Sequence, residues 1–374
     1  MLLEQGEAVT FQPAVEPSWG PRRLRALLGR GLGSAFDAAA IRAIAAMMDR
    51  SPLGDFEISR ARVEALVEAY GQAELLSEPE RFFRPASLPD ARETWTPGPL
   101  LPTVELRFRS AYRPFLPEYE PELGRYPDNL TVHARWYRSP SPRSTLVCIH
   151  GFGGGLFRLE EEVFGVARWL RAGMDVVLLQ LPFHGRRRPR NVSVAAALFP
   201  SPHVVRTNET FGQAVHDVHA LMLWLRARGA APAGLFGHSL GGYTAALLGT
   251  LQPAPAFVAA LSPASCLTDV MWMHGAHSGL HGRAQEAGIT RELMEAVFRV
   301  HSPLARPVLV PRERRFLIAG KADLLIPSHH ARALWSHWEH PALHWFDGGH
   351  VAQLGRAEAF LALRNWLAEH GLAR

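Results

Sequence analysis

The chain is 374 residues long and carries a formal net charge of +5, and its hydrophobic and charged fractions of 47% and 20% are those of an ordinary globular protein. So small a basic excess does not indicate a nucleic-acid-binding surface, and no apolar run reaches the roughly 18 residues that would predict a membrane-spanning helix. The only two cysteines, Cys148 and Cys266, predict neither a disulfide framework nor a metal site.

The N-terminal part of the chain is predicted to be helical. Its first residues lack the basic region and apolar run of a secretory signal, so we expect a cytoplasmic protein. Apolar positions three and four apart predict helices over 35–48 and 59–69, and a Pro-rich connector follows them. We therefore expect residues 1–102 to form a helical extension with its connector, and residues 103–374 to form one larger domain.

Short apolar runs and helical stretches follow one another from there to the C-terminus. The predicted strands are 103–109, 130–137, 146–149, 174–180, 233–236, 257–261, 315–320 and 344–346. The predicted helices are 160–171, a long amphipathic one at 208–228, 243–251, 291–300 and 356–367. The segment 262–306 does not fit a strand–helix unit, so we expect it to form a small cap.

The motif Gly237-His238-Ser239-Leu240-Gly241 reads G-x-S-x-G and lies between a predicted strand and a predicted helix. A serine on so sharp a turn is forced toward positive φ, which is strained for any residue with a Cβ. The flanking glycines remove side chains that would collide across the turn. The motif therefore predicts a nucleophile elbow with Ser239 exposed at the end of the strand. The alternative is a Gly-rich turn that carries a solvent-exposed serine.

A glycine-rich loop, His150-Gly151-Phe152-Gly153-Gly154-Gly155, follows an earlier strand. Its amides can point at a ligand, and we assign the backbone N–H groups of Phe152 and Leu240 to an oxyanion hole. A phosphate-binding turn is the competing interpretation. It is weaker because neither the G-x-x-x-x-G-K-[ST] spacing nor the dinucleotide-binding spacing is present.

Two further residues complete a possible catalytic set. Asp323 follows the strand 315–320 and precedes a proline, where its carboxylate could hold the tautomer of a histidine or else serve an ordinary turn. His350 follows two glycines after the last strand. Asp269 is the rival for the acid. We expect a hydrogen bond of about 2.6–3.2 Å between Ser239 and His350, or a somewhat looser one without substrate.

The order Ser239, Asp323, His350 is the chain order of α/β-hydrolases. From about residue 104 to its end, the chain resembles this superfamily. The resemblance implies the α/β-hydrolase fold, with a mostly parallel, doubly wound sheet and helices on both faces. It also implies that Ser239 is the nucleophile, His350 the base and Asp323 the orienting acid.

A finer resemblance is carried by Pro182-Phe183-His184-Gly185-Arg186 and the residues that follow it to Pro189. Many members of the superfamily have an Asp-x-x-Gly-x-Gly turn at this place, from which the chain departs. The segment is similar to the abhydrolase domain-containing protein 18 group, whose members also have a long N-terminal extension. This similarity implies a deacylase acting on an acyl ester or a lipid.

The cap and the loops beside Ser239 supply the candidate substrate contacts. An insertion at this position lies over the carboxyl edge of the sheet, where such folds bind ligands. Met271 and Trp272 would line an apolar acyl pocket, or would merely anchor the cap. We add His150, Gly151 and His238 to the candidate contacts, although the side chain of His238 should point away from the substrate.

Three cap histidines and an arginine run have competing interpretations. His274, His277 and His281 could lie on one helical face, but the glycines among them argue against a stable helix, so no metal site is predicted. The arginines could pair with a phosphate or carboxylate of the substrate, although we favour a solvated, salt-bridged loop. They are Arg186, Arg187, Arg188 and Arg190.

These observations predict a serine hydrolase that cleaves a carboxylic ester, with a small-molecule ester or a lipid acyl ester as substrate. The reaction would pass through an acyl-enzyme and requires no cofactor. The alternatives are a peptidase or amidase with the same triad, and a catalytically silent hydrolase fold that only binds. No nucleic-acid partner is predicted.

Overall fold

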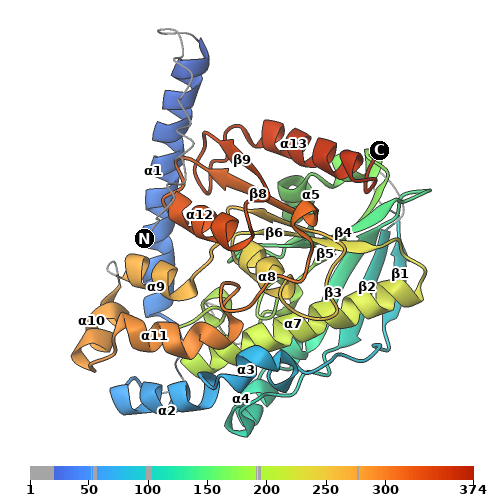
Figure 1. Cartoon of the computed structure of the whole chain (residues 1–374). Coiled ribbons are helices and arrows are strands. Elements are labelled where there is room, and N and C mark those ends of the chain that lie inside the picture. Colours follow the sequence, from blue (N-terminus) through green and yellow to red (C-terminus); the bar gives the residue numbers. More distant parts are fainter. Residues whose placement is uncertain are drawn as a thin grey trace, which may run out of the picture.

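The computed structural model describes residues 21–51, 53, 57–97, 103–190, 192, 195–275 and 278–374. Within these residues, nine strands form one sheet in the order β1-β2-β3-β5-β4-β6-β7-β8-β9 (Figure 1). The strands are β1 (Arg92–Thr96), β2 (Thr103–Arg109), β3 (Thr131–Tyr137), β4 (Ser144–Ile149), β5 (Met174–Leu179), β6 (Ala233–His238), β7 (Val258–Leu261), β8 (Arg315–Gly320) and β9 (Ala342–Phe346). β1, β2, β3 and β5 pair antiparallel in turn, and all pairs from β5 to β9 are parallel.

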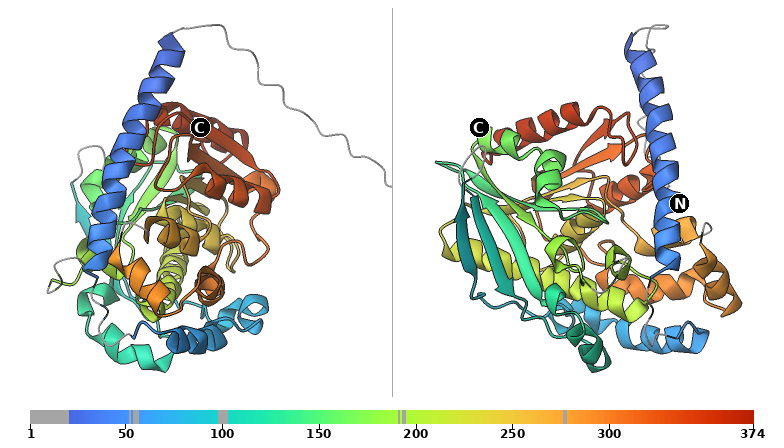
Figure 2. Two further views of the ribbon diagram at one scale, coloured as in Figure 1. Left: turned by 90° about the vertical axis from the view of Figure 1, so that its left-hand side faces the viewer. Right: turned by 180° about the vertical axis from the view of Figure 1, so that it is seen from behind.

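Helices lie on both faces of this sheet and at one end of it (Figures 1 and 2). They are α1 (Pro21–Asp49), α2 (Arg60–Tyr70), α3 (Glu74–Ser77), α4 (Glu120–Gly124), α5 (Phe157–Phe164), α6 (Val166–Arg171), α7 (Val204–Ala227), α8 (Leu240–Leu248), α9 (Leu267–Gly275), α10 (Gly279–Glu286), α11 (Arg291–Phe298), α12 (Ser328–His337) and α13 (Arg356–Glu369). Among the described residues, no helix combines the length and apolar character needed to cross a bilayer.

The two faces of the sheet bury alternate residues of each central strand. On β4, Leu146 and Cys148 join the cluster built with α5, α6 and α13, whereas Val147 and Ile149 join the cluster built with α7, α8 and α12. This alternation follows from the two-residue period of a strand. Burial of each large apolar side chain contributes about 1.5–3 kcal/mol. The predicted mostly parallel, doubly wound sheet with helices on both faces is thereby confirmed.

Some helix boundaries differ from those predicted. α1 begins at Pro21, whereas the apolar spacing predicted a start at residue 35. The single helix predicted over 160–171 is two helices, because Gly165 adopts a left-handed conformation (φ 64°) between α5 and α6. The cap segment contains α10 in spite of Gly279 and Gly282. The hydroxyl of Ser278 caps this helix by accepting from the N–H of Leu280.

β1 belongs to the sheet although it precedes the boundary expected at residue 102. It pairs with β2 from Arg92 opposite Arg107 to Thr96 opposite Thr103. Its residues are exposed or half-buried, as an edge strand allows. An edge strand of this kind lacks the apolar alternation from which strands are predicted, which explains why the sequence did not reveal it.

The prediction that the long helix α7 is amphipathic is wrong, because its residues from Val204 to Leu221 are buried on all sides. The carboxylate of Glu209 accepts hydrogen bonds of 2.6 Å from the hydroxyls of both Tyr70 and Tyr112. Burial raises the pKa of Glu209, although these hydrogen bonds oppose the shift. Tyr70 of α2 and Tyr112, which follows β2, therefore cover a carboxylate of α7 that would otherwise meet water.

The arginine run after β5 divides between surface and interior. Arg186 is exposed and pairs with Glu105 at 2.7 Å, as a solvated loop would. Arg187 is fully buried, and its Nη2 lies 2.7 Å from the Asp217 carboxylate of α7. It also donates to the carbonyl of Asn129. For Arg187 the expected solvated role is therefore wrong, because a buried carboxylate draws the guanidinium inward.

Candidate active site

Ser239 occupies a strained turn between β6 and α8. Its φ of 56° and ψ of −115° are unfavourable for a residue with a Cβ. The turn is held by glycines: a Cβ on Gly241 would lie 1.9 Å from the carbonyl oxygen of Ile149, and one on Gly237 would lie 2.0 Å from that of Gly241. The N–H of Ser239 donates to the Leu261 carbonyl at 2.9 Å. The predicted elbow geometry is therefore present.

Asp323 and His350 meet at the same edge of the sheet, because each follows the carboxyl end of one of the parallel strands β8 and β9. His350 Nδ1 donates to Asp323 Oδ2 at 2.8 Å, and both side chains are buried. The other carboxylate oxygen accepts from the N–H of Ile326 at 2.7 Å. Because Nδ1 keeps its proton and donates it in a hydrogen bond to the carboxylate, Nε2 of His350 is left as a proton acceptor.

The surroundings of His350 affect its basicity. Burial by itself would lower the pKa of His350, but the charge and hydrogen bond of Asp323, with a further contribution from Asp37, raise it above its usual value. The ring of His238 stacks on that of His350 with centroids 5.3 Å apart. Burial, and then the neighbouring His350, hold the pKa of His238 well below its usual range. His238 is therefore neutral. The stacking of the two rings also shows that the elbow lies against the loop that carries His350, called the histidine loop below.

Between the described residues Ser239 and His350, the structure forms no hydrogen bond, so the predicted contact is not made. The Ser239 hydroxyl can turn about a single bond, χ1. Hydrogen bonds between a nucleophile and its base commonly tighten only in the substrate complex. The stacked His238 and His350 rings place the histidine loop beside the elbow.

The amides of Phe152 and Leu240 are available to a ligand, since neither donates a hydrogen bond to another described residue. Both residues line the same cavity as Ser239. The glycine loop reaches the elbow directly, because a Cβ on Gly151 would lie 3.2 Å from the Cβ of Ser239. Two N–H donors beside a serine hydroxyl are what an oxyanion hole requires.

His150, Gly151 and His238 are not among the residues that line that cavity, and their contact with substrate stays a prediction. His150 is buried, and burial followed by the nearby His184 lowers its pKa to about 3. Its Nε2 accepts from the N–H of Leu181 at 3.0 Å, and its Nδ1 donates to the Gly151 carbonyl at 2.8 Å. Both ring nitrogens therefore hold the loops after β4 and β5 together.

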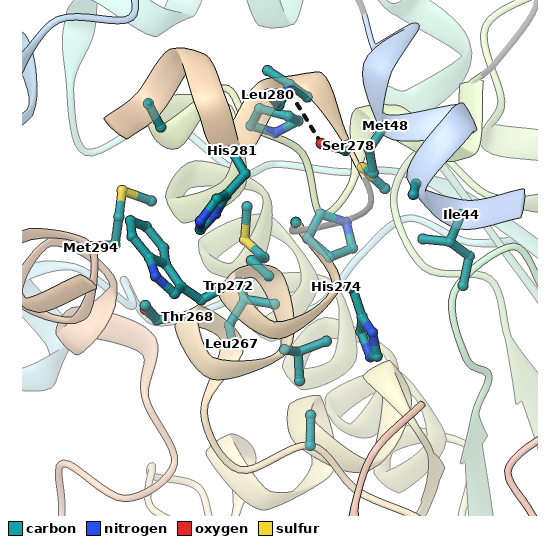
Figure 3. A pocket seen from close by; sticks show the side chains of 18 of the residues that line it. Ile44, Met48, Leu267, Thr268, Trp272, His274, Ser278, Leu280, His281 and Met294 are labelled. Atoms are coloured by element: carbon teal, nitrogen blue, oxygen red, sulfur yellow. Dashed lines mark hydrogen bonds between the residues drawn. The ribbon is translucent and has the colours of Figure 1, made fainter. Parts of the chain in front are cut away.

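The cavity above Ser239 has a volume of about 210 Å³ and is almost entirely apolar (Figure 3). Met271 and Trp272 of α9 line it, as predicted for the cap, and Met294 of α11 lies beside them. The edge of the Trp272 ring packs against His281 with centroids 4.9 Å apart. A polar substrate group would find few partners in this cavity, whereas a hydrocarbon chain would be well accommodated.

The N-terminal helix α1 supplies another wall of this cavity, which the sequence did not predict. Ile41, Ile44, Ala45 and Met48 all line it, and Figure 3 shows Ile44 and Met48 reaching it from α1. These positions repeat at the three- and four-residue spacing of a helical face. That spacing predicted an apolar stripe, but it carried no information about which surface the stripe would cover.

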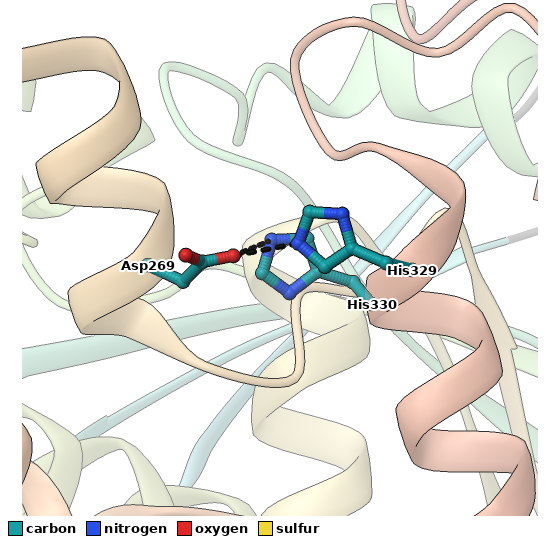
Figure 4. Close-up of side chains that lie close together, drawn as sticks. All are labelled: Asp269, His329 and His330. Atoms are coloured by element: carbon teal, nitrogen blue, oxygen red, sulfur yellow. Dashed lines mark hydrogen bonds and ion pairs between the residues drawn. The ribbon is translucent and has the colours of Figure 1, made fainter.

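Asp269, the rival acid, belongs to a separate cluster (Figure 4). Its Oδ2 lies 2.6 Å from Nε2 of His329 and 3.3 Å from Nε2 of His330, and its Oδ1 lies 2.8 Å from Arg291. The three ligand atoms are close enough for a metal ion. However, the Ser265 N–H donates to His330 Nδ1, which places the ring proton on Nε2. With a guanidinium also present, the cluster is better described as an ion pair of Asp269 with Arg291 and polar contacts of Asp269 with the two histidines.

Of the three cap histidines, the two that the structure describes have different partners. His274 Nε2 lies 2.7 Å from the Leu325 carbonyl, and His281 packs on Trp272, while His277 lies outside the described residues.

A family model described as "Alpha/beta hydrolase domain containing 18" matches residues 101–278. The protein named "Uncharacterized protein Rv2627c" of Mycobacterium tuberculosis (strain ATCC 25618 / H37Rv) is 33% identical over 309 residues, which cover 79% of this chain and 71% of that protein.

Two solved structures share the fold. An acetyl xylan esterase from Paenibacillus sp. R4 is 15% identical with a TM-score of 0.55, over 85% of this chain and 98% of the other. Acetyl xylan esterase 1 from Thermoanaerobacterium sp. JW/SL YS485 is 14% identical with a TM-score of 0.54, over 82% and 98%. From its sheet, its strained elbow and these matches, the chain belongs to the α/β-hydrolase superfamily and, within it, to the family described as alpha/beta hydrolase domain containing 18.

Proposed function

We propose that this protein is a serine hydrolase that cleaves a carboxylic ester with an apolar acyl group. The observation that carries the proposal is the position of Ser239, which sits at positive φ on the wall of an apolar cavity beside the amides of Phe152 and Leu240, neither of which donates to another described residue. The buried pair of His350 and Asp323 at the same sheet edge supports it.

The proposed reaction begins when Ser239 Oγ attacks the ester carbonyl carbon and His350 Nε2 takes the hydroxyl proton. The amides of Phe152 and Leu240 stabilise the oxyanion, each by about 10²–10³ in rate. His350 then gives the proton to the departing alkoxide, leaving an acyl-enzyme. The same histidine activates a water molecule that releases the acid, while Asp323 keeps the imidazole in the required tautomer and stabilises its cation.

The cavity supports an acyl group that is apolar and modest in size. Its volume of about 210 Å³ is below the roughly 300–1,000 Å³ that pockets for drug-sized ligands span. The two solved structures named above are esterases, which agrees with an ester substrate. The substrate would be a small ester or the acyl ester of a lipid. The cytoplasmic location of the protein stays a prediction.

A fluorophosphonate probe tests the nucleophile. We expect the wild-type protein to be labelled, Ser239→Ala to remain unlabelled, and Ser336→Ala, which alters an exposed serine of α12, to be labelled at the wild-type rate. Hydrolysis is then compared between p-nitrophenyl esters and aminoacyl-anilides. Failure to label the wild type, or equal labelling of Ser239→Ala, would contradict the proposal that the protein is a serine hydrolase. Cleavage of the anilides alone would indicate an amidase and not an esterase.

The acyl-chain preference tests the cavity. Since each buried methylene contributes about 0.8 kcal/mol, kcat/KM should rise about fourfold for each carbon added until the cavity is filled. Trp272→Ala enlarges the cavity and should move the preferred p-nitrophenyl ester to a longer chain. The control is Trp95→Ala, because this tryptophan of β1 is 58% exposed. An identical chain-length profile in Trp272→Ala and the wild type would show that acyl groups bind elsewhere.

A further inference from the structure

The buried carboxylate of Asp37, on α1, contacts both loops that carry the proposed acid and base. Its Oδ2 accepts from the N–H of Leu324 at 2.9 Å and from the N–H of His350 at 2.8 Å. Its Oδ1 accepts from the N–H of Val351 at 2.9 Å. Leu324 is the residue after Asp323, so one side chain of the N-terminal helix holds the backbone beside both members of the pair.

The backbone of α1 lies directly against the histidine loop, which brings Asp37 within reach of these amides. Gly33 lies one helical turn before Asp37, and a Cβ on Gly33 would be 2.5 Å from the backbone nitrogen of Gly349. A Cβ on Gly349 would in turn be 2.8 Å from Asp37 Oδ2. Helix and loop can approach this closely only because both positions are glycine.

We propose that Asp37 is a positioning residue, which holds the loops of Asp323 and His350 in register so that the imidazole faces Ser239. The helix α1 is thereby part of the active site and not a peripheral extension. The inference rests on the proposed function of the serine, the histidine and the aspartate.

Hydrogen bonds from backbone amides to an ionised carboxylate are about twice as strong as neutral ones. The three N–H groups that Asp37 binds belong to two different loops, so the carboxylate opposes any movement of one loop relative to the other. Without it, these amides would have to find other acceptors or remain unpaired, which is unfavourable away from water. The most direct consequence would be a shift of the His350 ring relative to Ser239.

Asp37 also acts on His350 through its charge. Among the described residues, the titratable groups that act on the imidazole are Asp323 from the loop after β8, Asp37 from α1, and the stacked His238 from the elbow. Burial lowers the pKa of His350, but Asp323 and then Asp37 raise it, while His238 is neutral. A carboxylate near the ring stabilises the imidazolium that forms when the base takes a proton.

The same helix continues into the substrate cavity. One turn beyond Asp37, Ile41 begins the apolar stripe that lines the cavity and ends at Met48. A displacement of α1 would therefore disturb the acid–base pair and the acyl site together. Figure 2 shows α1 running along one side of the molecule, past the C-terminal ends of the parallel strands.

The test compares Asp37→Asn and Asp37→Ala with the wild type in hydrolysis of a p-nitrophenyl ester. A misplacement of about 1 Å costs on the order of 10²-fold in rate, so we expect kcat to fall by about that factor in Asp37→Ala and by less in Asp37→Asn, which keeps one carbonyl oxygen. The charge-matched control is Asp90→Asn, an exposed aspartate next to β1 at the opposite edge of the sheet, which should retain wild-type kcat.

The pH profile separates positioning from a loss of folded protein. Asp37 raises the pKa of His350, so its removal lowers that pKa, and the acid limb of kcat/KM in Asp37→Asn should move to lower pH. A smaller amount of folded enzyme would lower the amplitude without moving this limb. An acid limb at the wild-type pH together with wild-type kcat in both Asp37 variants would overturn the inference.

Two measurements need no turnover and so distinguish this inference from the proposed function. Hydrogen–deuterium exchange of the segments 321–326 and 347–354 should be faster in Asp37→Asn, and NMR titration should report a lower pKa for His350. Unchanged exchange in both segments and an unchanged pKa contradict the role of Asp37, even if Ser239 proves not to be a nucleophile. If Asp37→Ala does not fold, Asp37→Asn alone decides.

Discussion

Replacing Ser239 with alanine is expected to lower kcat for ester hydrolysis by on the order of 10⁶-fold, because loss of the nucleophile removes the acyl-enzyme route. The free energy of unfolding should change little. The Ser239 hydroxyl makes no hydrogen bond with another described residue, so its removal leaves no buried partner unsatisfied. Steady-state kinetics and denaturant unfolding of the same preparation measure both quantities.

Ser239→Gly is the matched variant for the strain of the elbow. Alanine keeps the Cβ that is unfavourable at a φ of 56°, whereas glycine does not. Glycine should therefore be more stable than alanine at this position by about 1 kcal/mol, with strain relief partly offset by the greater entropy of its unfolded chain. Substantial turnover by either variant would exclude Ser239 as the nucleophile. A glycine variant less stable than the alanine variant would show that the backbone at residue 239 is not strained.

Asp323→Asn is expected to lower kcat by about 10⁴-fold, because an amide at this position no longer favours the tautomer that leaves Nε2 free. The pH profile should change as well. A base must be neutral to accept a proton, so kcat/KM falls as the pH drops through the pKa of His350. Since Asp323 raises that pKa, the variant's acid limb should move to lower pH. Kinetics across the pH range with one p-nitrophenyl ester measure both effects.

Asp269→Asn provides the control for this experiment. Asp269 is the other acidic candidate, but its carboxylate pairs with His329, His330 and Arg291 and makes no hydrogen bond with His350 among the described residues. This variant should keep kcat within a few-fold of the wild type and leave the acid limb where it is. A large loss in Asp269→Asn with full activity in Asp323→Asn would reverse the assignment of the acid.

The elements that could be predicted depend on local chemistry. The turn at Ser239 requires glycine at 237 and 241, because backbone atoms lie within about 2 Å of where a Cβ would be. A steric requirement that involves so few neighbouring residues appears in the sequence as a short motif. The central strands were located for the same reason, since β7 and the part of β5 from Val176 to Leu179 are apolar runs buried on both faces.

Other features depend on partners far along the chain. The spacing of Ile41, Ile44 and Met48 indicated an apolar face, yet only packing against α9 and α10 made it a wall of the substrate cavity. The polar residues of α7 suggested contact with water, but the whole helix from Val204 to Leu221 is buried, and Tyr70 and Tyr112 bind its Glu209. β1 was missed because an exposed edge strand needs no apolar alternation.

The sequence by itself therefore determined the superfamily, the succession of the central strands and helices along the chain and the candidate nucleophile, base and acid, because each depends on a short motif or a local period. Only the tertiary structure decided that Asp323 and not Asp269 pairs with His350, and that Asp37 binds amides more than 280 positions away. Such contacts form when two surfaces that are distant in the sequence pack together, and the type of one residue does not predict which residue will be its partner.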